Sequence, residues 1–120
     1  MNRDEVTAAI LAAVPRVTAV AEVSTDSNGA GKALRVKVRT ADTAPMSGRE
    51  LQDLVHAVWT SSDVEPNAIR ITARDAATGD VPVDLRSAAS DVYPDGRGYN
   101  DFGDLGVAII ATEDLLGSRP

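Results

Sequence analysis

Apolar and polar positions follow two different periods in the middle of the chain, from residue 33 to residue 75. After Ser47, apolar residues recur at spacings of three and four, as Leu51, Leu54, Val55, Val58 and Trp59. This spacing predicts an amphipathic helix with one apolar stripe. In the segments 34–39 and 69–74, apolar residues alternate with Arg, Lys or Thr, which is the period of a strand with one apolar face. The middle of the chain is therefore predicted to form a strand, a helix and a second strand.

The start of this helix is specified by a capping box, Ser47-Gly48-Arg49-Glu50. The Ser47 hydroxyl is expected to accept from the Glu50 amide, and the Glu50 carboxylate from the Ser47 amide, so that donors at the helix start find partners. Met46 and Leu51 occupy the positions of a hydrophobic staple. A strand, a crossover helix and a second strand normally form a right-handed unit with parallel strands. The helix should therefore cover the apolar face of both strands and leave the other face basic.

The residues before this unit predict a helix and a hairpin. Asn2 is expected to cap the first helix with Glu5 three positions later, and Pro15 to end it. Its apolar stripe is Val6, Ile10, Leu11 and Val14. Residues 17–23 are rich in β-branched side chains and predict a strand, which the turn-forming residues that follow should join to 33–40 as an antiparallel hairpin.

The last third of the chain is less regular. Residues 81–83 predict a short strand, which Pro82 restricts to a sheet edge. Asp84 is expected to cap a third helix with a stripe of Leu85, Ala88, Ala89 and Val92. Residues 93–106 have loop chemistry, and whether that loop is ordered stays open. Residues 107–111 are compatible with a strand or a helix, although length and β-branching favour a strand, and the final residues are expected to be frayed.

These elements predict a single α+β domain over residues 1–120. It has a single-layer mixed sheet of three to five strands with two main helices on one face. We interpret the order helix, strand, strand, helix, strand, short strand, helix, strand as a ferredoxin-like variant. The first 75 residues resemble the small cytoplasmic domain of cation-efflux transporters, at 8–20, 33–40 and 47–58. The metal-binding histidines of that family have no counterpart here, so the resemblance implies no functional residue.

Composition narrows the function. The chain of 120 residues has no cysteine, which excludes disulfides, thiolate nucleophiles and cysteine metal sites. Its net charge of −6 argues against general nucleic-acid binding. The first residues do not resemble a secretory signal, and the apolar runs are too short to span a bilayer. We therefore expect a cytoplasmic protein without membrane insertion.

Motifs for catalysis or cofactors are weak. The only histidine, His56, falls away from the apolar stripe and should face solvent. Residues 29–31 lack the rest of a dinucleotide fingerprint, and 101–103 match the kinase magnesium tripeptide by chance. The loop 91–104 carries aspartates that could collect calcium, but the spacing misses the EF-hand pattern. No cofactor, metal or catalytic residue is expected, and an enzyme using this loop is the least supported function.

Two surfaces remain as candidates for binding. The first is a basic row on the predicted sheet face, Arg35, Lys37, Arg39, Arg70 and Arg74, five of the twelve Lys and Arg residues. Its structural interpretation is a solvated sheet face with Glu22 or Asp75 as ion-pair partners. The second is formed by Tyr93, Tyr99 and Phe102, three of the four aromatics, which either anchor a loop or form a contact.

From these surfaces we derive two functional hypotheses. The first is a non-enzymatic protein-interaction or accessory module that acts through the aromatic segment, with a protein partner or with itself as a homodimer. The rival hypothesis is an anion or nucleic-acid binder that uses the basic row.

Overall fold

The computed structural model describes residues 1–27, 29, 31–100 and 105–120, and over these residues the chain is an α+β protein with one five-stranded mixed sheet. The helices are α1 (Arg3–Ala13), α2 (Gly48–Ser61), α3 (Arg86–Val92) and α4 (Glu113–Leu116). The strands are β1 (Val17–Ser27), β2 (Lys32–Thr40), β3 (Ala68–Asp75), β4 (Gly98–Asn100) and β5 (Val107–Ile110). Their order in the sheet is β1-β2-β3-β5-β4.

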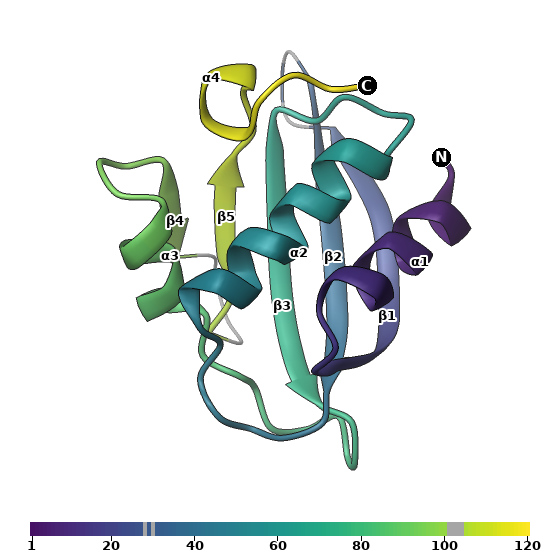
Figure 1. Cartoon of the computed structure of the whole chain (residues 1–120), viewed down its shortest axis with the longest axis vertical. Helices are drawn as coiled ribbons and strands as arrows, with labels where there is room; N and C mark the ends of the chain where they lie inside the picture. The colour runs from purple at the N-terminus through teal and green to yellow at the C-terminus, as the bar shows by residue number, and fades with distance from the viewer. Residues whose placement is uncertain (28, 30, 101–104) are drawn as a thin grey trace.

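The predicted hairpin and crossover are both confirmed. Strand β1 pairs with β2 antiparallel, and β2 pairs with β3 in parallel, with Leu34 opposite Ile69 and Val36 opposite Ile71. Strand β5 then pairs antiparallel with both β3 and β4. In Figure 1, α2 crosses one side of the sheet diagonally, and α1 lies beside it on the same side over β1. The apolar residues of these strands and helices form one core.

The start of α2 is a capping box, as predicted. The Glu50 amide donates to the Ser47 hydroxyl at 3.1 Å, and the Ser47 amide donates to the Glu50 carboxylate at 3.0 Å. All five residues of the predicted stripe are buried: Leu51, Leu54, Val55, Val58 and Trp59. The capping box therefore predicted where this helix begins, and the apolar period predicted which side it buries.

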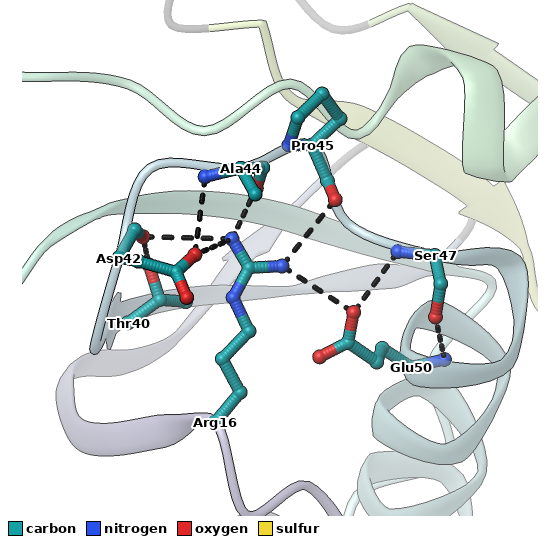
Figure 2. A network of polar contacts seen from close by, with 7 residues as sticks. All are labelled: Arg16, Thr40, Asp42, Ala44, Pro45, Ser47 and Glu50. Atoms are coloured by element: carbon teal, nitrogen blue, oxygen red, sulfur yellow. Dashed lines mark hydrogen bonds and ion pairs between the residues drawn. The ribbon is translucent and has the colours of Figure 1, made fainter.

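The loop before α2 is held by Arg16, whose side chain is 13% exposed (Figure 2). Its Nη2 lies 2.8 Å from the Asp42 carboxylate and also donates to the Ala44 carbonyl. Its Nη1 donates to the Pro45 carbonyl at 3.4 Å and to the Glu50 carboxylate at 3.3 Å. One guanidinium therefore joins the turn after α1 to the loop and to the capping box of α2.

The predicted cap of α1 is wrong in its chemistry. Asn2 stands at the N-cap position, but its side chain accepts no capping hydrogen bond from the helix. The side-chain Nδ2 of Asn2 instead donates to the Ser61 carbonyl at 2.7 Å and to the Glu5 carboxylate at 3.0 Å. Its Oδ1 accepts from the backbone amide of Asp63 at 2.9 Å. Asn2 therefore ties the start of α1 to the end of α2. In the predicted stripe of α1, Leu11 is the exception, because it is 39% exposed.

Three expectations for the last third need correction. The predicted strand at 81–83 is a single bridge between Pro82 and Arg74. Helix α3 has Leu85 at its N-cap position, although the Asp84 carboxylate does accept from the Arg86 amide at 2.9 Å. The predicted loop 93–106 contains β4, which pairs with β5. The open question at 107–111 is decided in favour of a strand.

The C-terminal end is tied down rather than frayed. Trp59 Nε1 donates to the Gly117 carbonyl at 2.9 Å, and Arg119 donates to the carbonyls of Trp59 and Ser62. The Arg119 guanidinium also lies 5.4 Å from the centre of the Trp59 ring, a cation–π contact. These contacts give the final residues partners that a sequence pattern does not reveal.

Candidate functional site

The five residues of the predicted basic row all lie on the side of the sheet opposite the core. In the parallel pairing of β2 and β3, Arg35 lies opposite Arg70, and Arg39 lies opposite Arg74. Lys37 lies opposite Thr72 between these pairs. Each is partly or fully exposed, whereas the residues that alternate with them are buried. We call this side of β1 to β5 the basic face.

Carboxylates of β1 pair with part of the row. Arg35 Nη2 lies 2.8 Å from the Asp26 carboxylate, and Arg70 Nη1 lies 3.7 Å from it. Lys37 Nζ lies 3.9 Å from the Glu22 carboxylate. These side chains are between 30% and 48% exposed, so each pair contributes about 1 kcal/mol or less to stability. Glu22 is thus a partner as expected, and Asp26 is one that was not foreseen.

Asp75 does not pair with the row, because its side chain belongs to the core side of β3. It is 7% exposed and holds the turn after β3, accepting from the Thr78 amide at 2.8 Å and the Val81 amide at 3.0 Å. These backbone donors, Val81 first and Thr78 next, lower the pKa of Asp75 to about 2. The turn they stabilise brings Gly79, at φ +72°, back against the basic face.

The end of the basic face next to Gly79 is hollowed. A hollow of about 230 Å³ is lined by Ala21, Lys37, Val38, Arg39, Thr72, Arg74 and Gly79. The Arg39 guanidinium lies over Gly79, where a Cβ atom would collide with it. Its Nη1 is buried and, among the described residues, has no hydrogen-bond partner. Arg74 Nη1 donates to the Gly79 carbonyl at 3.1 Å.

The three predicted aromatic residues separate in the structure. Tyr93 is only 4% exposed, so it is an anchor of the core, and burial raises its pKa to about 12, with the charge of Asp53 adding to the effect. Tyr99 is 52% exposed. Phe102 lies outside the described residues. The interface hypothesis therefore rests, in this part of the chain, on Tyr99.

Strand β4 places Tyr99 on the basic face. Tyr99 lies opposite Ala108 of β5, and Ala108 lies opposite Arg70 of β3. Ile110 has the same orientation two residues further on, opposite Ala68, and is 38% exposed. Tyr99 and the basic row, which we predicted as parts of two different surfaces, therefore lie on one face. Tyr99 and Ile110 form an apolar edge beside its cations.

His56, the one histidine weighed for catalysis, is exposed, as predicted. Among the residues that the structure describes, there is no group of three or more His, Cys, Asp or Glu side chains that could hold a metal ion. In the acidic loop, Asp91 and Asp95 are exposed, while Asp101 and Asp104 lie outside the described residues. No helix in the described ranges is long and apolar enough to cross a membrane.

Comparison of the chain with protein-family models, with curated proteins and with solved structures gave no match.

Proposed function

We propose that the chain is a non-enzymatic protein-binding module whose basic face docks an acidic segment of a partner protein. The observation that carries this proposal is the register that sets Tyr99 and Ile110 beside Arg70 on one exposed sheet face. Tyr and Arg are among the residues enriched at the hot spots of protein interfaces. Exposed Tyr99 supplies contact area with few rotatable bonds, and the neighbouring guanidinium groups supply directed donors.

Charge favours an acidic partner. Among the described residues of the basic face, five cations stand against the carboxylates of Glu22 and Asp26, although the whole chain carries −6. A partner with carboxylates at matching positions would gain from charge complementarity. Two copies docked through this face would instead bring like charges together, which is unfavourable. The homodimer thus stays a prediction, and it would have to use another surface.

The rival hypothesis, nucleic-acid binding, uses the same cations. Its support is that an exposed tyrosine next to arginines is a stacking platform for bases. The apolar edge opposes it, because Ile110 is 38% exposed beside Tyr99 and a protein partner can cover it with an apolar side chain, whereas a phosphate backbone cannot.

Fluorescence anisotropy can separate the two hypotheses with two labelled probes of equal charge. One is a glutamate-rich peptide that contains leucine and tyrosine, and the other is a single-stranded oligonucleotide. We expect the peptide to bind more tightly, and Tyr99→Ala to weaken it about tenfold or more, in the range of an interface hot spot. Arg49→Gln is the matched control, because Arg49 is an exposed cation on α2. Tighter binding of the oligonucleotide, or equal peptide binding by Tyr99→Ala and wild type, would refute the proposal.

Two finer predictions accompany this function. The first is that the fold is a ferredoxin-like variant, which the order helix, strand, strand, helix, strand from α1 to β3 supports. The second is that the protein acts in the cytoplasm.

A further inference from the structure

The hollow at the end of the basic face contains an unmet hydrogen-bonding group. Arg39 Nη1 is buried against Gly79 and has no hydrogen-bond partner or ion pair within the described part of the chain. Burying a charged donor without a partner is unfavourable, and buried polar groups in native proteins are nearly always satisfied. The Arg39 guanidinium is therefore held at the wall of the hollow with hydrogen-bonding capacity that the described residues do not use.

The neighbours of Arg39 define the chemistry of that ligand. Lys37 also lines the hollow, and its ion pair with Glu22 is long, with 3.9 Å between Nζ and the carboxylate. Arg74, on the neighbouring strand β3, also lines the hollow. It donates to the Gly79 carbonyl and so fixes the turn that shapes the hollow. None of the lining residues that the structure describes is acidic. Three cations around one concavity select a compact anion with several acceptor oxygens.

We propose that this hollow binds a phosphate-type oxyanion, held by Arg39 and Lys37 with Arg74 alongside. Arginine is suited to this role, because its fork of N–H donors matches the oxygens of a phosphate group. The bound anion would accept from the part of the Arg39 side chain that lines the hollow, since Nη1 itself is covered by Gly79. The site is independent of the docking edge at Tyr99, and the oxyanion can be a free phosphate compound or a phosphorylated side chain of a partner.

Gly79 is part of the site because it has no side chain. A Cβ atom at this position would collide with the Arg39 guanidinium, and the positive φ of the residue also disfavours alanine. The Gly79→Ala variant should therefore displace the guanidinium and weaken the anion site without removing a charge.

Inorganic phosphate is the first probe. We would titrate it into ¹⁵N-labelled protein at constant ionic strength and follow backbone amide and arginine Nε signals. We expect saturable shifts confined to the hollow, at Lys37, Arg39, Thr72, Arg74 and Gly79. Arg39→Gln should weaken binding about tenfold or more, which corresponds to about 1.4 kcal/mol. Arg49→Gln, which removes an exposed cation of α2 that does not line the hollow, should bind as wild type.

A second arm identifies the source of the anion. A short glycine-rich peptide with one phosphoserine would bind more tightly than inorganic phosphate if a partner supplies the anion, and equally if a small molecule does. Lys37→Gln removes an exposed cation of the same hollow and should also weaken phosphate binding. It tests the site independently if the Arg39→Gln variant does not fold. Shifts that do not saturate, or equal weakening by Arg39→Gln and Arg49→Gln, would overturn the proposal. Neither result would affect binding at Tyr99, which is measured with the unphosphorylated acidic peptide.

Discussion

Tyr99 of β4 and Arg70 of β3 lie on the same face of the sheet, joined in register through Ala108 of β5. Ala108 is fully buried although it belongs to this outer face, and Tyr99 is half exposed. The relationship is what turns a basic sheet face and an aromatic loop into one surface. It depends on a three-residue strand, Gly98–Asn100, at the edge of the sheet.

The first prediction concerns the core under α2. Leu54 is fully buried in the apolar stripe, so Leu54→Ala should lower the free energy of unfolding by roughly 2–5 kcal/mol. Denaturant unfolding measures the change. Gln52→Ala, on the exposed side of the same helix, should cost no more than about 0.5 kcal/mol. A loss that small for Leu54→Ala would contradict the packing.

The second prediction concerns Arg16, which joins the loop before α2 to the rest of the fold (Figure 2). Arg16→Ala removes the ion pair with Asp42 and the charge-assisted hydrogen bond to Glu50 from a side chain that is 13% exposed. We expect a loss of about 1.5–3 kcal/mol in stability, the usual range for hydrogen bonds to charged groups. Arg49→Ala is the control, since its side chain is 82% exposed. Thermal unfolding of the two variants should differ clearly, and similar melting temperatures would refute the role of Arg16.

The third prediction concerns pH. The folded pKa of Asp75 is about 2 and its ordinary value is 3.8, so folding favours the ionised form. The stability that Asp75 supplies is complete above the ordinary value and is lost as the pH falls from 3.8 through about 2. Asp75→Asn should therefore destabilise the protein most at neutral pH, with the difference from wild type shrinking in acid. Urea unfolding at pH 7, 4 and 2.5 would show this, and a difference independent of pH would contradict it.

The fourth prediction concerns the C-terminal residues. The only tryptophan, Trp59, is 1% exposed and donates to the Gly117 carbonyl. Deleting residues 117–120 should expose its indole, shift its emission to longer wavelength and increase quenching by iodide. Arg119→Ala should produce a smaller change in the same direction. It removes the cation–π contact and two hydrogen bonds but leaves the Gly117 carbonyl in place. If the emission spectrum stayed unchanged in both variants, the tail would not pack on Trp59.

Sequence patterns correctly predicted the features that depend on residues close together in the chain. The capping box and the stripe of α2 follow from residues within one helix, and both are present. The cap of α1 could not be predicted in this way. From the sequence, Glu5 is the only visible partner of Asn2, whereas Ser61 and Asp63 reach it only once α1 and α2 are packed together.

The surface was harder to predict than the helices. Gly98, Tyr99 and Asn100 have turn-forming neighbours, and their strand exists because β5 supplies its hydrogen bonds. Tyr93 and Tyr99 look alike in the sequence, but one follows α3 into the core while the other projects from β4. The hollow could not be predicted from the sequence either, because it forms only when the turn at Gly79 folds back against Arg39 of another strand.

The most direct test of the proposed function is quantitative affinity capture from a lysate of the protein's own organism. Wild type, Tyr99→Ala, Arg70→Gln and Arg49→Gln would serve as parallel baits, with each captured protein measured by mass spectrometry. We predict an acidic protein that wild type and Arg49→Gln retain equally, and that Tyr99→Ala and Arg70→Gln each lose, because Arg70 lies beside Tyr99 and outside the hollow. A partner retained equally by all four baits, or no partner enriched by wild type, would contradict docking through the basic face.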